Sequence, residues 1–195
     1  MEKQLTVLLK ELEQFGADND ARVTDHKARM LNITPETGAF LALLIRAIKP
    51  RRILEIGTSN GYSTLWLAYA AQPFGGQVVT VEHLPAKAEM ARRNFERAGL
   101  SSSITQHLTK ADRFLEAQSD SSFEFIFLDS DRREYTGWWP SLRRILTVGG
   151  LMVADNAVSH EHELREFLQW VNADPGYMTS LVPVGKGELL ILKES

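Results

Sequence analysis

The chain has 195 residues, a formal net charge of -3 and no cysteine. This length suits one domain with a sizeable core, and the 44% hydrophobic and 24% charged residues are typical of a globular protein. The slightly acidic balance argues against a nucleic-acid-binding protein, which needs a basic face. The lack of cysteine excludes disulfides, a thiolate nucleophile and cysteine-ligated metals.

The sequence also argues against a membrane protein. No stretch approaches the roughly 20 apolar residues that cross a bilayer. The N-terminal run Met1-Glu-Lys-Gln-Leu5 lacks the apolar centre of a signal peptide. We therefore expect no membrane partner and a cytoplasmic location.

Three helices are predicted before the first strand. Leucines and Phe15 recur at helical spacing over residues 2–15, and Gly16-Ala-Asp-Asn19 is expected to end that helix. A more charged helix is expected over residues 20–31. A third is predicted over residues 35–48, where Thr34 can cap the helix and Pro35 suits its first turn.

From residue 50 onward, apolar runs alternate with helical patterns. Strands are predicted at 52–57, 78–83, 104–109, 123–129 and 150–155, and helices at about 61–72, 85–98, 111–118, 134–146 and 161–173. Two closing runs, 179–184 and 189–193, flank a glycine-rich turn and predict an antiparallel hairpin. The pattern indicates a three-layer α/β fold with a mostly parallel sheet of seven strands, in a single domain over residues 1–195.

The first strand ends in a glycine-bearing turn, Gly57-Thr-Ser-Asn-Gly-Tyr-Ser63, which leads into a helix. Glycines allow the backbone to approach a ligand closely, and the helix start offers free N–H groups to an anionic group. Ser59 and Tyr62 depart from the Gly-x-Gly-x-x-Gly pattern of dinucleotide-binding proteins, which argues against a dehydrogenase. The turn is expected to hold another nucleotide-like cofactor.

Polar residues follow the other predicted strands, and the parallel topology brings all these strand ends to one edge. The set consists of Glu82, Asp112, Asp129, Asp155 and Asn156. A cofactor with a ribose would use Glu82, whereas a hard cation would use the last three oxygen ligands. A lone Asp after a strand is more often a helix cap or a turn residue, and a lone Glu need not bind ribose, so the prediction depends on their joint occurrence.

Five segments together resemble the S-adenosylmethionine-dependent O-methyltransferases of the catechol and caffeoyl-CoA type. They are Leu54-Glu-Ile-Gly-Thr-Ser-Asn-Gly-Tyr-Ser63, Val81-Glu82, Ala98-Gly-Leu100, Phe127-Leu-Asp129 with Tyr135, and Gly149-Gly-Leu-Met-Val-Ala-Asp-Asn156. The resemblance runs from about Ile33 to the C-terminal hairpin. It implies a Rossmann-like class I methyltransferase fold.

The resemblance also implies roles for individual residues. S-adenosylmethionine would be held by Glu55, Gly57, Ser59, Gly61, Tyr62, Ser63, Glu82, His83, Ala111, Asp112 and Asp129. Within this set, Ser63 would contact the methionine carboxylate, Glu82 the ribose, and Ala111 and Asp112 the adenine. Asp129, Asp155 and Asn156 match the metal ligands of the family, which hold an acceptor with adjacent hydroxyl groups, and the ion would be Mg²⁺ or a similar cation.

The catalytic residues implied by the resemblance are Asp129 and the residue three positions after it. Family members carry a lysine base there, and this chain carries Arg132, whose guanidinium cannot act as a base. Three explanations are open. Arg132 stabilises an anion while the metal acidifies the acceptor; or another group (Asp131, His160, His162 or His26) is the base; or the site methylates something different or is inactive. Arg132 could also form a surface ion pair with Glu134 or Asp131.

The acceptor side matches the family less well than the cofactor side. Residues 1–34 are expected to cover it, with Met30 and Leu31 in the acceptor wall, and Lys186 stands where relatives often carry Asp. Tyr135, Trp138 and Trp139 are expected to pack in the core or an interface, or else to line an aromatic pocket. A homodimer is expected from the resemblance alone.

The sequence thus predicts a metal-dependent O-methyltransferase that acts on a small hydroxylated, catechol-like molecule. Two alternatives keep the cofactor. One is a metal-independent methyltransferase with another acceptor, and the other is a non-catalytic protein that binds S-adenosylmethionine.

Overall fold

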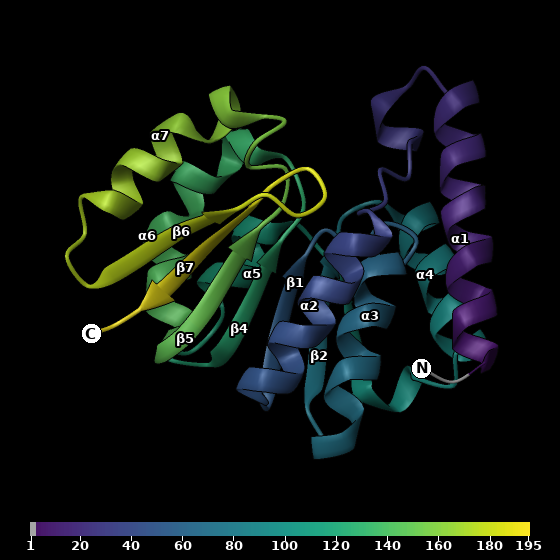
Figure 1. Ribbon diagram of the computed structural model, residues 1–195, viewed down its shortest axis with the longest axis horizontal. Coiled ribbons are helices and arrows are strands. Elements are labelled where there is room, and N and C mark those ends of the chain that lie inside the picture. The colour runs from purple at the N-terminus through teal and green to yellow at the C-terminus, as the bar shows by residue number, and fades with distance from the viewer. Residues whose placement is uncertain (1–2) are drawn as a thin grey trace.

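The computed structural model describes residues 3–195, and its centre is a seven-stranded sheet with the order β3-β2-β1-β4-β5-β7-β6 (Figure 1). The strands are β1 (Arg52–Ile56), β2 (Gln77–Glu82), β3 (Ile104–Leu108), β4 (Phe123–Leu128), β5 (Leu146–Ala154), β6 (Tyr177–Val182) and β7 (Glu188–Lys193). Strands β1 to β5 pair in parallel, and β7 runs antiparallel to both β5 and β6. The predicted sheet and its C-terminal hairpin are confirmed.

Helices cover both faces of this sheet, as the predicted three layers require. They are α1 (Lys3–Arg22), α2 (Pro35–Ile48), α3 (Tyr62–Ala71), α4 (Pro85–Arg97), α5 (Ala111–Glu116), α6 (Tyr135–Ile145) and α7 (Glu161–Asn172), with short 3-10 turns η1 (His26–Ala28), η2 (Gln72–Phe74), η3 (Ser101–Ser103) and η4 (Arg132–Glu134). Helices α1 to α4 share one hydrophobic cluster with the sheet, and α5 to α7 share the other.

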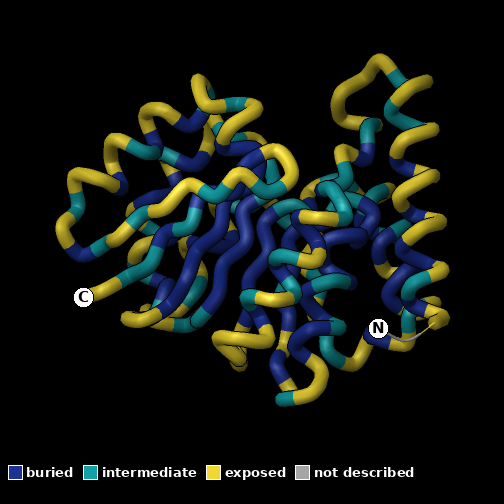
Figure 2. The backbone as a smooth tube through the Cα atoms, viewed as in Figure 1, coloured by how far each residue is buried: buried dark blue, intermediate teal, exposed yellow. Residues whose placement is uncertain are grey.

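Alternation along the strands explains why both clusters form. On β1, Ile53 belongs to the cluster of α1 to α4, and its neighbour Leu54 belongs to the opposite cluster. Phe125 and Ile126 on β4 divide in the same way. Successive side chains of a strand point to opposite faces, so a continuous apolar run fills both layers. Figure 2 shows these central strands buried between the more exposed helices.

The N-terminal prediction was wrong in one respect. Helix α1 continues through Gly16 to Arg22, so it takes in the first residues of the region predicted as a second helix, and the 3-10 turn η1 is the other helical part of that region. A Cβ on Gly16 would lie 2.5 Å from the Asn32 amide nitrogen, which donates to the Leu12 carbonyl at 3.0 Å. Gly16 is therefore a close-packing position within the helix and does not end it. Residues 1 and 2 of the predicted helix and domain lie outside the described residues.

Strand β5 also differs from its prediction, because it begins at Leu146 instead of residue 150. Leu146 pairs with Phe123, and the register then shifts so that Phe125 pairs with Leu151. The intervening irregularity accommodates Gly149, whose φ is +77°. The strand end that bears Asp155 is unaffected.

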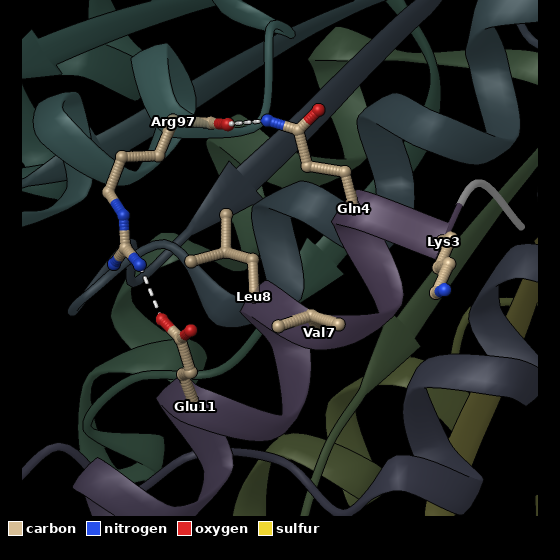
Figure 3. Close-up of a pocket in the computed structure, with 6 residues that line it drawn as sticks. All are labelled: Lys3, Gln4, Val7, Leu8, Glu11 and Arg97. Atoms are coloured by element: carbon tan, nitrogen blue, oxygen red, sulfur yellow. Dashed lines mark hydrogen bonds and ion pairs between the residues drawn. The ribbon is translucent and has the colours of Figure 1, made fainter.

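Helix α1 is attached to α4 through polar contacts at the rim of a surface hollow of about 540 Å³ (Figure 3). Glu11 forms an ion pair with Arg97, and the Gln4 amide donates to the Arg97 carbonyl at 3.3 Å. These contacts and the buried leucines of α1 join the N-terminal helix to the main core. Across residues 3–195, the structure contains no helix that is both long and apolar enough to span a membrane.

Candidate active site

The carboxyl ends of β1, β2, β4 and β5 lie side by side, and backbone hydrogen bonds extend the ladder one residue beyond them. The Gly57 N–H donates to Val81, the Asp129 N–H to Ile56 and the Asp155 N–H to Leu128, each at 3.0 Å. The structure therefore brings the Gly57 loop, Glu82 and the acidic strand ends to one edge. The parallel topology predicted this convergence.

Gly57 has no room for a side chain. Its φ is +108°, and a Cβ would lie 2.0 Å from the Asp129 carbonyl oxygen. Gly61, which precedes α3, has a φ of +86°, and a Cβ there would lie 2.6 Å from the Phe95 ring. Both positions favour glycine because L side chains rarely adopt positive φ. The turn between them is thereby held tightly over the strand ends.

Glu82 is only 6% exposed, and its carboxylate is oriented by backbone donors. It accepts hydrogen bonds from the N–H groups of Ser59 at 2.9 Å, His83 at 2.8 Å and Leu84 at 2.9 Å. The Ser59 hydroxyl donates to the Met30 carbonyl at 2.8 Å, which ties the N-terminal segment to this loop. Glu82 is thus a pre-oriented acceptor at the mouth of the Gly57 loop.

The other residues predicted on the adenine side lie next to Glu82. His83 and Asp112 line a surface hollow of about 530 Å³, together with Leu108, Thr109, Lys110 and Arg113. Ala111 is the first residue of α5 and precedes Asp112. The His83 ring lies 3.5 Å from the Glu82 carboxylate and is 60% exposed. The hollow adjoins Glu82, because the Thr109 N–H donates to the Glu82 carbonyl at 2.9 Å.

Glu55 lies beneath the loop, fully buried, and three hydroxyl groups donate to its carboxylate. The donors are Ser63 at 2.6 Å, Thr80 at 2.6 Å and Thr64. Because the Ser63 hydroxyl hydrogen is given to Glu55, this side chain supports the loop from inside, and its predicted contact with a methionine carboxylate stays a prediction. Tyr62 is 2% exposed and packs in the hydrophobic cluster of α1 to α4.

Glu55→Gln is expected to flatten the pH dependence of stability of the ligand-free protein. Burial raises the pKa of Glu55 to about 7, although the three hydroxyl donors lower it. Because this pKa exceeds the usual 4.5, protonated Glu55 stabilises the folded state. This stabilisation is complete below pH 4.5 and is lost as the pH rises through 7. Between pH 5 and 8 the loss amounts to about 2 kcal/mol. Urea unfolding at pH 5 and at pH 8 measures this loss, and Glu116→Gln, at an exposed position, is the control. If the free energy of unfolding changed equally with pH in the Glu55→Gln and native proteins, the prediction would be contradicted.

Asp129, Asp155 and Asn156 lie together at the ends of β4 and β5. Asp155 is 3% exposed and Asn156 is 7% exposed, and the Asn156 amide donates to the Asp155 carboxylate. Burial and the neighbouring Asp155 raise the pKa of Asp129 well above its usual value, while Arg132 and Lys186 act in the opposite direction. These neighbouring carboxylates are the kind of oxygen pair that a hard cation stabilises. Within residues 3–195, however, no cluster of three or more His, Cys, Asp or Glu side chains has a metal-binding arrangement.

Arg132 pairs with a residue that the sequence analysis did not single out. Its Nε donates to the Glu163 carboxylate of α7 at 2.7 Å, and the two side chains are 15% and 23% exposed. Asp131 pairs with Arg133 instead. The predicted alternative of a surface pair with Glu134 or Asp131 was therefore wrong, because the partner comes from a helix 31 residues further along the chain.

Comparison with known proteins agrees with this geometry. A family model described as O-methyltransferase matches residues 3–194. The chain belongs to this O-methyltransferase family. Catechol O-methyltransferases of Niastella koreensis and Mycobacterium tuberculosis are each 37% identical, over 70% and 65% of this chain. These matches span 62% and 57% of the relatives, less than two thirds of their lengths.

Solved structures of the family share the whole fold. The O-methyltransferase from Bacillus cereus, solved in complex with SAH (S-adenosylhomocysteine), has a TM-score of 0.80 and 27% identity. That alignment covers 96% of this chain and 91% of the other. The predicted Rossmann-like methyltransferase fold is confirmed.

The aromatic residues after β4 have a packing role in this O-methyltransferase fold. Tyr135, Trp138 and Trp139 are at most 8% exposed and belong to the cluster of α5 to α7. The Tyr135 ring lies edge-on to Phe167, and its hydroxyl accepts from the Ser130 N–H at 2.9 Å. The expectation of core packing is confirmed, and Tyr135 also supports the loop that follows Asp129.

Glu188 is a buried acidic residue that the sequence analysis missed. It is fully buried, accepts from the Thr37 hydroxyl at 3.0 Å, and its second carboxylate oxygen has no hydrogen-bond partner among the described residues. Burial and the nearby Asp155 raise the pKa of Glu188 to about 9. The sequence signal was limited to a charged residue at the head of an apolar run. The observed register pairs Leu189 with Ala154 and so places Glu188 beside Asp155.

The candidate bases lie in different places. The ring of His160 accepts or donates one hydrogen bond with the Ser159 hydroxyl at 2.8 Å, and burial and the Arg132 charge lower its pKa. His162 is 73% exposed and lies 3.8 Å from Glu163. His26 is an exposed residue of η1. His160 is the histidine whose surroundings include Arg132 and Lys186.

Proposed function

We propose that this protein is an S-adenosylmethionine-dependent O-methyltransferase that methylates a small hydroxylated, catechol-like acceptor with the help of a divalent cation. One observation carries the proposal: a pre-oriented acidic residue, Glu82, and an acidic group of strand ends lie on either side of the tight Gly57 loop. The 37% identity to catechol O-methyltransferases supports the acceptor class.

The cofactor half of the proposal rests on the loop and the hollow beside it. Gly57, Ser59 and Gly61 form the turn that would hold the methionine part, with Glu55, Tyr62 and Ser63 supporting it from below. Glu82 would accept hydrogen bonds from the ribose hydroxyls, and His83, Ala111 and Asp112 would border the adenine. S-adenosylmethionine supplies an electrophilic methyl group on a sulfonium. The protein contributes the placement of donor and acceptor.

The acceptor half rests on Asp129, Asp155 and Asn156. Their oxygens fit a hard cation such as Mg²⁺, because the buried Asp155 carboxylate and the half-buried Asp129 carboxylate beside it gain most from a nearby positive charge. Such an ion lowers the pKa of hydroxyl groups that it binds. Asp129 would also border the cofactor, since its carbonyl faces Gly57.

Arg132 would stabilise charge and would not transfer a proton. Its guanidinium remains protonated, and Glu163 holds one edge of it at 2.7 Å. From this position its positive charge lowers the pKa of Asp129, which burial and Asp155 raise. We therefore propose that Arg132 stabilises the negative charge of an ionised acceptor.

The test is methyl transfer from labelled S-adenosylmethionine to catechol. Activity is expected with Mg²⁺, to disappear with a chelator and to return with Mg²⁺ or Mn²⁺. Asp155→Ala should lower activity by at least about 100-fold, since it removes a cation ligand. Asp120→Ala, whose side chain is 79% exposed and remote from the strand ends, should keep native activity. Activity that is indifferent to both the chelator and Asp155→Ala would contradict the cation role.

A metal-independent methyltransferase is the second candidate. The fixed Arg132–Glu163 pair favours it, because a guanidinium can bind an anionic acceptor directly.

Cofactor binding without methyl transfer to any acceptor would instead indicate a non-catalytic protein. The homodimer, the cytoplasmic location and the covering of the acceptor by residues 1–34 stay predictions.

A further inference from the structure

Basic side chains surround the acidic strand ends, and they come from separate segments of the chain. Arg132 lies in η4, His160 precedes α7, and Lys186 lies in the turn between β6 and β7. The positive charges of Arg132 and Lys186 both lower the pKa of Asp129, and both also lower the pKa of His160. The three basic groups therefore all lie near the proposed acceptor site.

The turn that carries Lys186 has a defined position. The Lys186 carbonyl accepts from the N–H groups of Val158 at 3.2 Å and Ser159 at 3.1 Å, and the Ala157 N–H donates to Gly187 at 2.8 Å. His160 in turn donates its N–H to the Asn156 carbonyl at 2.9 Å. These bonds join the turn to the segment that follows Asp155 and Asn156, so Lys186 cannot move far from the acceptor site without breaking them.

The basic groups differ in how far they are neutralised. Glu163 pairs with Arg132, and Ser159 contacts His160. Lys186 is exposed, and the ion pairs found among residues 3–195 do not include it. An exposed ammonium group without a carboxylate partner, held at the rim of a site, is available to a negatively charged ligand.

We propose that the preferred acceptor carries a carboxylate in addition to its adjacent hydroxyl groups, and that Lys186 binds this carboxylate at the rim. This inference rests on the proposed function. The hydroxyl groups lie at the strand ends, where Asp129 and Asp155 would hold them through the proposed cation. The carboxylate lies at the end of the acceptor that is opposite its hydroxyl groups. There Lys186 attracts it, and the partly exposed His160 lies nearby.

The test compares two acceptors of the same shape, 3,4-dihydroxybenzoate and its neutral amide, 3,4-dihydroxybenzamide. The native protein should have a kcat/KM at least about 10-fold higher for the carboxylate, and the difference should lie in KM, because a charge-assisted hydrogen bond contributes to binding. Lys186→Gln should raise the KM for the carboxylate about 10-fold and leave the amide within about twofold. Lys186→Arg should retain the preference, and Lys10→Gln, an exposed lysine of α1, should behave like the native protein.

Isothermal titration of both compounds, with S-adenosylhomocysteine and Mg²⁺ present, gives a second measurement that does not depend on turnover. The carboxylate should bind more tightly than the amide, and high salt should reduce the difference because Lys186 is exposed. Equal kcat/KM for both acceptors, or a preference that survives Lys186→Gln, would overturn the inference while leaving the O-methyltransferase proposal intact. No transfer to catechol or to either acceptor would contradict both.

Discussion

Glu82→Ala is expected to weaken S-adenosylhomocysteine binding by at least about 100-fold, because the proposed ribose contact consists of charge-assisted hydrogen bonds. The substitution also removes the acceptor of the Ser59, His83 and Leu84 N–H groups. The loop over the strand ends would then lose the group that orients it. Isothermal titration with S-adenosylhomocysteine measures the effect directly.

Two further variants separate cofactor contact from loop support. Glu82→Gln keeps one carbonyl oxygen for the backbone donors but loses the charge, so its affinity should lie between those of the native protein and the Glu82→Ala variant. Glu89→Ala removes an exposed carboxylate of α4 that pairs with Arg92 and Arg93, and it should bind like the native protein. A folded Glu82→Ala variant with native affinity would disprove the ribose role of Glu82.

Gly57→Ala is expected to reduce the free energy of unfolding by at least about 3 kcal/mol. The new Cβ would lie 2.0 Å from the Asp129 carbonyl oxygen, and the backbone at a φ of +108° is unfavourable for any L side chain. The clash is with the backbone, which cannot rotate away as a flexible side chain can. The loop or the end of β4 must shift, so cofactor affinity should fall as well. Urea unfolding measures the first effect, and titration measures the second.

Gly137→Ala is the matched control for this substitution. Gly137 is an exposed residue inside α6, and a Cβ there would have no neighbour within 4 Å among the described residues. Alanine should therefore stabilise the helix by about 0.5–1 kcal/mol. If both alanine variants had the same small effect, the close contact between Gly57 and Asp129 could not be the reason for glycine at position 57.

Local sequence patterns were sufficient to predict the features that depend on single strands and helices and on their order. Continuous apolar runs such as Phe125-Ile-Phe-Leu128 predict strands that are buried on both faces, and the helical patterns between them require a parallel sheet. The same reasoning placed Glu82, Asp129 and Asp155 at one edge. The long N-terminal helix was not predictable in this way, because Gly16 packs against Asn32, which comes from a separate segment.

The site shows the same division. The Gly57 loop and the acidic strand ends could be identified from the sequence alone, because strand direction places them in register without any knowledge of distant contacts. Only the tertiary structure decided that Arg132 pairs with Glu163, that Glu188 lies buried beside Asp155, and that the turn bearing Lys186 is joined to residues 157–159. Each of these contacts joins residues that are far apart in the sequence, and no local propensity encodes such a pairing. The physical reason is that periodicity reports which face of an element is buried, whereas the partner of a charged side chain depends on how whole elements pack.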